Sequence, residues 1–436
     1  MEADELFQPH PMLKVLRNNP LAWVKERLDK VIVGEDNNKL LLFLSKLSYL
    51  TSEPLHCILK GESSAGKSWL AENVLRAFPE DDVIKVSRVT PAWLDRCKNL
   101  KHKILYVQQL GGAESIQSSL HVMLSEKGLV LGTVKRGEGG NWEPYYVQTE
   151  GPVSFVSTTT RLMLDPQLET RCFHVYPDES PEQTLRIQKL QQIWDECPWK
   201  KEEALEAVKE IRELVEFVKK YGVKKVIVPF SRLITLPSKN LRIRRDRPKL
   251  MGLVKTLAML NQWKRFVLEI KGERYVLAEW EDFLDVLHIA EDVLTATMQE
   301  LSQRERQLLE CCFKAFGRDW FSAKQASLVS KEKMSQRTAR RYLNRLVDKG
   351  YLFLEQEGRG RGLTNMYSVN VDAMENLQKT VFAGLTVLPK QELRNALKAW
   401  VTENIGNGRV ELYKYDDEGS LKHYGYIQAG KLFKVA

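Results

Sequence analysis

The chain of 436 residues has a net charge of +9, and its composition of 43% hydrophobic and 28% charged residues is typical of a globular protein with two or three domains. No apolar stretch approaches the roughly 18 residues that a membrane-spanning helix needs, and the polar N-terminus is not a secretory signal. We therefore expect a cytoplasmic protein with no membrane contact. The 6 cysteines lack the spacing of metal ligands and are expected to be reduced thiols.

Positive charge is concentrated in one part of the chain. Residues 301–370 contain 14 Lys and Arg against 7 Asp and Glu. A local excess of this kind suggests an anionic partner such as nucleic acid.

A phosphate-binding loop is the strongest motif. Residues 61–68 match the pattern G-x-x-x-x-G-K-[S/T] without a gap, between an apolar run that predicts a strand and a run that predicts a helix. Backbone N–H groups and the lysine of such a loop hold the phosphates of ATP, and Ser68 is the predicted Mg²⁺ ligand. The predicted ATP-binding residues are Gly61, Glu62, Ser63, Ser64, Ala65, Gly66, Lys67, Ser68 and Trp69.

Further apolar runs predict a parallel α/β sheet. Five short runs, separated by helical patterns, are expected to be strands: residues 55–59, 82–86, 103–107, 152–157 and 172–176. Strands that alternate with helices favour a parallel sheet covered on both faces, with phosphates bound at the carboxyl ends of the strands.

Residues 128–149 interrupt this alternation with a predicted β-hairpin. Its glycine-rich tip is flanked by Lys135, Arg136 and Trp142. We interpret it as an arm that contacts nucleic acid through its cations and stacks Trp142 on a base; a surface hairpin without such a role is the alternative.

The segment 181–300 is predicted to be mostly helical. It contains a basic cluster over residues 242–247, which is either a solvated helix face or a phosphate contact. After residue 372 the pattern indicates only a small α+β tail, 373–436, to which we assign no role.

Residues 301–372 have the pattern of a winged helix-turn-helix. In its third predicted helix, 335–349, Ala339, Leu343 and Leu346 repeat at core spacing, while Arg337, Arg341 and Asn344 share another face. Arg359 and Arg361 lie in a predicted basic wing. We predict that Arg337, Arg341, Arg359 and Arg361 bind DNA; a winged helix used only for protein contacts is the alternative.

The order of these features resembles the AAA+ ATPases, and among them the minichromosome-maintenance-like helicases and related helicases of mobile-element or plasmid replication. The resemblance covers roughly residues 22–370. It implies an N-terminal arm at 1–20, an α/β ATPase core at 21–180 with a pre-sensor hairpin, a helical lid at 181–300, the winged helix and the α+β tail. The large N-terminal DNA-binding region of that family is not present before the ATPase core.

The resemblance also implies roles for individual residues. Thr159, where the family usually has Asn, would orient the attacking water. Arg171 would act as an arginine finger in a neighbouring subunit, and Arg247, or less favourably Arg245, would be the second sensor arginine. Lys135 or Arg136 would be the hairpin contact to DNA.

One departure from the family affects catalysis. The third strand should end in Asp-Glu but is followed by Gln108 and Gln109. Glutamine cannot act as a general base, and loss of general-base catalysis costs on the order of 10² to 10⁴ in rate. Three explanations are open. Gln109 is an engineered Glu→Gln change, which is the interpretation we favour; or the chain is a naturally slow or inactive ATPase; or Glu114 supplies the acid.

We therefore predict an ATP- and Mg²⁺-dependent DNA helicase or translocase that acts in replication as a homo-oligomeric ring, expected to be a hexamer, on single-stranded DNA. The alternative is a non-unwinding initiator or transposition-type regulator that assembles on DNA with ATP. A signalling ATPase whose winged helix binds protein is a third hypothesis. Gln109, Gln108, Thr159, Arg171 and Arg247 are the predicted catalytic positions, and Gln108 and Gln109 would leave the chain inactive as given if no other acid replaces them.

Overall fold

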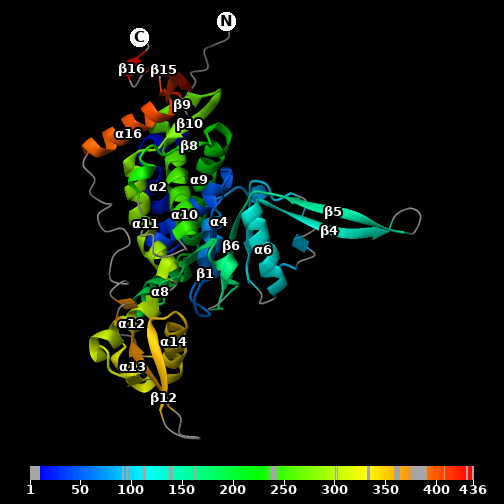
Figure 1. Cartoon of the computed structure of the whole chain (residues 1–436). Helices are drawn as coiled ribbons and strands as arrows, with labels where there is room; N and C mark the ends of the chain where they lie inside the picture. The colour runs from blue at the N-terminus through cyan, green and yellow to red at the C-terminus, as the bar shows by residue number, and fades with distance from the viewer. Residues whose placement is uncertain are drawn as a thin grey trace. The chain divides into compact units, whose positions relative to one another are not determined.

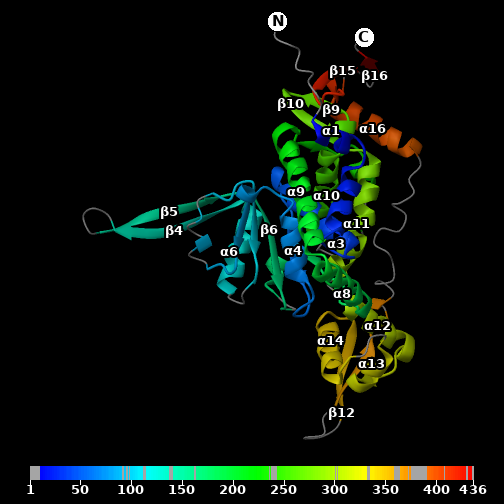
Figure 2. The same ribbon diagram turned by 180° about the vertical axis from the view of Figure 1, so that it is seen from behind.

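The computed structural model describes residues 10–90, 93–94, 97, 99–110, 114–136, 141–161, 164–234, 236, 243–299, 301, 303–330, 334–357, 364–371, 373–374, 390–406, 408–428 and 431–434. The chain divides into two compact units, Met1–Glu291 with Thr386–Ala436, and Asp292–Leu385 (Figures 1 and 2). Within the described part of the chain, no helix has the length and apolar character needed to cross a membrane. All six cysteines are free thiols.

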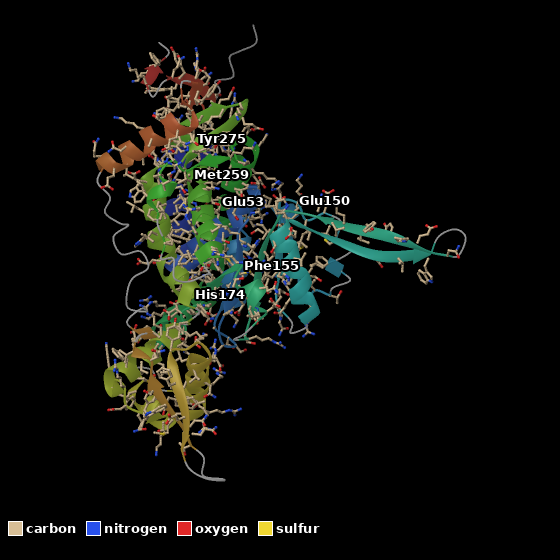
Figure 3. The ribbon with its side chains drawn as sticks, viewed as in Figure 1. Glu53, Glu150, Phe155, His174, Met259 and Tyr275 are labelled. Atoms are coloured by element: carbon tan, nitrogen blue, oxygen red, sulfur yellow. The ribbon has the colours of Figure 1, made fainter. Side chains whose placement is uncertain are left out.

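A parallel sheet forms the centre of the first unit, with the strand order β2-β3-β6-β1-β7. Its strands are β1 (His56–Lys60), β2 (Val83–Val86), β3 (Lys103–Val107), β6 (Val153–Thr159) and β7 (Cys172–Val175). Each begins and ends within two residues of its predicted position. Every residue of β1, β6 and β7 is buried, as in a sheet covered on both faces. Phe155 and His174, labelled in Figure 3, lie in two of these strands.

Short helices precede and connect the strands. They are α1 (Pro11–Arg17), α2 (Pro20–Asp29), α3 (Asp36–Leu47), α4 (Lys67–Leu75), α6 (Glu114–Glu126) and α7 (Pro166–Glu169), with 3₁₀ turns η1 (Ser48–Leu50) and η2 (Glu80–Asp82). The sequence suggested only a polar arm or lead-in before residue 21. The structure instead places α1 there, with Met12, Leu13 and Leu16 buried. A seven-residue helix is too short to show a clear period in the sequence.

A β-hairpin made of β4 (Gly128–Arg136) and β5 (Trp142–Glu150) projects from the end of α6 (Figure 1). This confirms the predicted hairpin. Thr149 anchors its base by donating a hydrogen bond to the carbonyl of Leu94 (3.0 Å). The two ends of the hairpin also approach closely at Gly151. A Cβ there would lie 2.2 Å from the carbonyl oxygen of Lys127, so the base of the hairpin has room only for glycine.

Long helices follow the sheet: α8 (Pro181–Glu196), α9 (Pro198–Tyr221), α10 (Ile243–Leu260) and α11 (Trp280–Gln299), with 3₁₀ turns η3 (Ser231–Leu233) and η4 (Gln262–Lys264). The helical prediction for 181–300 missed three strands, β8 (Val226–Ile227), β9 (Val267–Ile270) and β10 (Glu273–Leu277). They are short, and although β9 pairs with β10 and β10 with β8, β9 also pairs with a strand from a distant part of the chain.

That distant strand is β14 (Arg409–Tyr415), the first of three tail strands with β15 (Leu421–Gln428) and β16 (Lys431–Lys434), which follow α16 (Lys390–Asn404). The three tail strands and β8, β9 and β10 together form a 6-stranded sheet in the order β16-β15-β14-β9-β10-β8 (Figure 1). The described tail is therefore part of the first unit, not a separate appendage. The sequence could not reveal this, because β14 pairs with β9 across more than a hundred residues.

The second unit contains α12 (Gln303–Phe316), α13 (Ala323–Val329) and α14 (Gln336–Asp348), with β11 (Phe321–Ser322), β12 (Leu352–Glu357) and β13 (Thr364–Val369). Its antiparallel sheet has the order β11-β13-β12. Ser335 caps α14 by accepting a hydrogen bond from the backbone N–H of Thr338 (3.1 Å). Ala339, Leu343 and Leu346 are buried, as their spacing predicted.

Candidate functional site

The phosphate-binding loop connects β1 to α4 at the carboxyl edge of the parallel sheet. Gly66 is the N-cap residue of α4 and has φ +78°, a left-handed conformation that glycine adopts without strain. Ser64 also has a positive φ of 68°. The loop therefore turns sharply enough to direct its N–H groups and the N-terminus of α4 toward a phosphate.

Lys67 is the cation of this loop. Its side chain folds back over the loop, where Nζ donates a hydrogen bond to the carbonyl of Gly61 (3.1 Å) and a very short one to the carbonyl of Glu62. Burial lowers the pKa of Lys67, while Glu179 and Glu62 act in the opposite direction. A bound phosphate would replace these carbonyl contacts with a charge-assisted one.

Glu179 also contacts the loop, which the sequence did not single out. Its Oε1 accepts a hydrogen bond from the backbone N–H of Glu62 (2.8 Å). A Cβ at Gly61 would lie 2.7 Å from the same oxygen, so Gly61 permits this close approach. A carboxylate is thus held against a loop built to bind anions.

Trp69 packs beside the loop. Its indole Nε1–H donates to the carbonyl of Val31 (3.2 Å), and its ring lies 5.9 Å from that of Trp194 in α8. Gln183 donates from Nε2 to the carbonyl of Val33 (2.6 Å). The segment between α2 and α3, the start of α8 and the phosphate-binding loop therefore meet at one place.

Gln108 and Gln109 directly follow β3, at the same edge of the sheet. The side-chain amide of Gln108 donates from Nε2 to Glu72 of α4 (3.0 Å), and its Oε1 accepts from the hydroxyl of Ser87 (2.8 Å). The Oε1 atom of Gln109 lies 3.5 Å from Nη2 of Arg88. The side chain of Glu114, the alternative acid, lies outside the described residues.

Thr159 ends β6 and pairs in register with Lys60 of β1, directly before the loop. Its side-chain oxygen accepts a hydrogen bond from the backbone N–H of Arg161 (3.0 Å). Because β6 lies between β1 and β3, the loop, Thr159 and the two glutamines are brought together at the carboxyl edge.

A Mg²⁺ ion needs oxygen ligands, most of which come from phosphates and water at nucleotide sites. Ser68 is exposed in the first turn of α4 and suits this role. Among the described residues there is no cluster of three or more His, Cys, Asp or Glu side chains that could hold a metal by itself. The residues present therefore fit an ion that arrives with the nucleotide, whose charge it would neutralise.

The opposite, amino edge of the sheet carries a pocket of about 420 Å³. It is lined by the first residues of β1 and β6 and by the segment before β7, where Arg171 lies. Glu53, labelled in Figure 3, also lines it. Its cations come from three separate parts of the chain: Lys127, Arg171, Arg244, Arg245 and Lys249.

Hydrogen bonds hold the cations of this basic pocket in place. Arg171 makes very short bonds to the hydroxyl of Ser125 and the carbonyl of Gln167. Burial and electrostatic repulsion from the neighbouring Arg245 both lower the pKa of Arg171. A site that holds like charges together is suited to bind an anion.

Arg247 and Arg245 lie in different surroundings. Arg247 donates from Nη2 to the carbonyl and hydroxyl of Ser231 (both 2.9 Å), whereas Arg245 lines the basic pocket and bonds Thr170. Arg245 is therefore the one placed beside Arg171. Lys249 and His56 also line the pocket, but neither belongs to a sequence motif that would have identified it.

The predicted DNA-binding residues of the hairpin lie near its tip. Arg136 and Trp142 are opposite each other in the register of β4 and β5, and the Trp142 side chain is 66% exposed. The side chains of Lys135 and Arg136 lie outside the described residues. Tyr145 and Tyr146 on β5 are exposed as well, so the ribbon carries aromatic rings that the sequence analysis did not single out.

In the second unit, Arg337 and Arg341 are exposed on α14. Asn344, predicted to share their face, accepts a hydrogen bond at Oδ1 from the hydroxyl of Tyr367 (2.6 Å). Arg345 and Lys349 are instead paired with the buried carboxylate of Glu305. Arg359 and Arg361 lie outside the described residues.

Residues 8–220 match the family model described as MTBMA_p00010 P-loop domain. The match includes the phosphate-binding loop and the whole parallel sheet, and that sheet with its helices fits a P-loop α/β fold. This part of the chain therefore has a P-loop α/β fold. A comparison with curated proteins found no match.

Several solved structures resemble the chain at low similarity. A full-length MCM homolog from Methanopyrus kandleri is 16% identical with a TM-score of 0.38, over 67% of this chain and 63% of that one. The C-terminal region of NrS-1, in an A-form apo structure, is 14% identical with a TM-score of 0.28, over 84% and 80%. The Aeropyrum pernix Orc1 protein in complex with DNA is 14% identical with a TM-score of 0.25, over 86% and 98%.

Proposed function

We propose that the chain is an ATP-dependent DNA translocase or helicase that acts in replication as a homo-oligomeric ring, with six members as the expected number. ATP binds between copies, and each closure of an interface moves DNA-contacting elements along a single strand. The proposal is supported by the P-loop domain, by the position of Arg171 and by the basic and aromatic elements outside the sheet.

The separation of the two cationic sites carries the oligomer part of the proposal. Lys67 follows the carboxyl end of β1, whereas Arg171 precedes the amino end of its neighbour β7. A parallel strand rises about 3.3 Å per residue, so the length of β1 separates the two edges by roughly 15 Å. Arg171 therefore lies too far away to reach the ATP of its own chain, and in the proposed ring a second copy brings the two sites together.

In this arrangement each residue has a defined task. Lys67 and the loop N–H groups hold the β- and γ-phosphates, Ser68 binds Mg²⁺, and Thr159 orients the attacking water. Arg171 from the next copy, with Arg245 beside it, stabilises the charge that develops on the γ-phosphate. Arg247 remains the second-sensor prediction from the family resemblance, with its side chain bonded to Ser231.

A second candidate function is favoured by Gln108 and Gln109. An amide at the position of the general base allows ATP to bind but not to be hydrolysed efficiently. The chain would then be an initiator or regulator that assembles on DNA with ATP and does not unwind it.

Mixing two defective chains tests the shared site. We expect Lys67→Ala and Arg171→Ala, each in a Gln109→Glu background, to be inactive alone. Together they should recover part of the ATP turnover, because some interfaces then combine an intact loop with an intact Arg171. If Arg171→Ala alone keeps full turnover, or if the mixture stays inactive while both chains assemble, the shared site is wrong.

The DNA part is tested separately by binding of single-stranded DNA over a range of salt concentrations. Replacing Lys135 and Arg136 by alanine should weaken binding and lower the slope of log K against log salt by about 0.7 per lost phosphate contact. Unchanged affinity and slope would remove the hairpin from the proposal. Unwinding of a forked duplex by the Gln109→Glu chain separates the motor from the initiator.

A further inference from the structure

The C-terminal sheet of the first unit has two unlike faces. One face is covered by α16: Leu268, Val410 and Leu412 are buried there with Trp400 and Ile405 packed against them. This face is an ordinary apolar core.

A continuous row of side chains crosses the other face. In the register of the strands, Arg274 is opposite Glu269, Glu269 opposite Glu411, Glu411 opposite Tyr426, and Tyr426 opposite Phe433. Side chains directly opposite on neighbouring strands point to the same face of a sheet. The row therefore spans β10, β9, β14, β15 and β16.

The outer part of the row is an aromatic stack at the edge of the sheet. The rings of Tyr426 and Phe433 are stacked, with centroids 4.9 Å apart and an interplanar angle of 14°. The guanidinium carbon of Arg409 lies 3.9 Å from the centroid of the Tyr426 ring. Phe433 is 41% exposed, so the stack is open to solvent.

A second aromatic group lies next to this row. Tyr413 is opposite His423, with ring centroids 5.4 Å apart, and the guanidinium carbon of Arg274 lies 5.1 Å from the Tyr413 centroid. Further along β14 the same face becomes buried, because Tyr415 packs against Trp263. The open area is therefore bounded on one side by the core of the unit.

Carboxylates hold the arginines in place on this surface. Glu411 accepts from Nε of Arg409 (2.5 Å), and Glu269 accepts from Nε of Arg274 (3.2 Å). Both guanidinium groups remain about half exposed, at 52% and 51% of the side chain. They are oriented by the carboxylates but still accessible to a ligand.

We propose that this aromatic face, formed by Arg274, Arg409, Tyr413, Tyr426 and Phe433, binds a short segment of single-stranded nucleic acid. A base stacks on the open side of the Tyr426–Phe433 stack, and phosphates contact the arginines and Lys431, which is exposed on β16. An open antiparallel sheet with ordered rings suits unpaired bases, since every base has a π face. Duplex nucleic acid keeps its bases stacked internally and does not offer them to such a surface.

The three cations on this face, Arg274, Arg409 and Lys431, limit how strongly nucleic-acid binding can depend on salt. At about 0.7 per phosphate contact, log K should fall with log salt with a slope no steeper than about −2. Binding through the aromatic face needs neither ATP nor a second copy. The inference is therefore independent of the proposed ring.

The test is fluorescence anisotropy of a labelled oligothymidylate of about 12 residues with the full-length chain, without nucleotide. Replacing both Tyr426 and Phe433 by alanine should weaken binding at least about tenfold, because the aromatic stack that holds a base is removed. Leu432→Ala is the matched control, because Leu432 is 51% exposed on the same strand but is opposite Ile427 and faces the other side. It should bind within about twofold of the unaltered chain.

Two further variants keep the test decisive. Arg409→Glu leaves the rings and core intact and should also weaken binding, even if the double alanine variant folds poorly. Lys67→Ala should lose ATP binding but keep oligothymidylate binding at this face, which separates the inference from the proposed function.

Photocrosslinking of an oligothymidylate that contains 5-iodouracil locates the bound strand. The expected crosslinks are to peptides that contain Tyr413, Tyr426 or Phe433. If the aromatic variants and Arg409→Glu bind normally and crosslinks form only elsewhere, the proposal is wrong and the rings serve the stability of the sheet. If the aromatic variants instead change only self-association, β16 is an edge for a second chain and the proposal is likewise wrong.

Discussion

The two edges of the central sheet present positive charge in different ways. At the carboxyl edge, one short stretch of chain supplies backbone N–H groups, a helix N-terminus and Lys67. At the amino edge, guanidinium and ammonium groups from three distant segments line the basic pocket. The first site is a contiguous motif that works through the backbone. The second exists only after folding and works through side chains.

Because of this difference, the carboxyl edge suits the holding of a phosphate and the amino edge suits contact with a ligand from outside. Backbone N–H groups are fixed in place and hold a phosphate with little rearrangement, whereas long arginine side chains can engage a ligand that arrives from a neighbouring molecule. The predictions below separate the edges, beginning with the largest expected effect.

The largest effect is expected at the carboxyl edge, from Gln109→Glu. A carboxylate at this position can accept a proton from the attacking water, so ATP turnover should rise roughly 10²- to 10⁴-fold. Steady-state phosphate release measures it. Gln108→Glu is the matched control: it places a second carboxylate beside Glu72, and turnover should not rise. If the Gln109→Glu chain binds ATP but shows no gain in turnover, the missing general base is not the only reason for slow hydrolysis, and the motor hypothesis is contradicted.

Lys67→Ala should weaken the binding of Mg²⁺–ATP roughly 10- to 100-fold, because a charge-assisted contact to phosphate is lost. Equilibrium dialysis of the dilute chain measures this affinity. Arg245→Ala at the amino edge should leave it unchanged. Equal losses in the two variants would show that the edges act on the same bound nucleotide.

The basic pocket should also make the fold sensitive to acid through His56. Burial, together with Lys46 and Lys249, lowers the pKa of His56 to about 3 from an ordinary value of 6.5. Between pH 6.5 and about 3 the unfolded chain binds a proton there that the folded chain does not, so stability falls as the pH falls through this window and is fully kept above it.

His56→Gln removes this titration and keeps an oxygen that can accept the hydrogen bond now made by the backbone N–H of Phe155 to Nδ1 (3.3 Å). The loss of unfolding free energy between pH 7 and pH 4 should shrink by on the order of a few kcal/mol. Urea denaturation at both pH values measures it. An unaltered pH dependence would mean that His56 is protonated in the folded chain.

The smallest effect is expected from Glu179→Gln. The amide oxygen can still accept the hydrogen bond from Glu62, but the negative charge beside the loop is removed. ATP should bind a few-fold more tightly, as expected for one charge in a solvated site, and the gain should decrease with salt. Glu182→Gln, in the exposed first turn of α8, is the control. Weaker binding would show that Glu179 recruits the nucleotide.

Much of the first unit could be predicted because its signals are local. The strands of the parallel sheet are nearly continuous apolar runs, and the loop at 61–68 is defined by residues next to one another. The hairpin and the predicted helix 335–349 were also found where the pattern placed them. The helix α1 and the strands β8, β9 and β10 were missed because each is short, and the sheet that contains these strands is completed by the distant strand β14.

The sequence by itself determined that this chain has a P-loop, which strands surround it and that the expected acids after β3 are amides. Those properties depend on residue types at fixed spacing along the chain. Only the tertiary structure decided that Arg245 joins Arg171 while Arg247 does not, that Glu179 lies against the loop, and that the tail completes a sheet with an aromatic face. Contacts between distant segments depend on how the elements pack, and no local pattern encodes them.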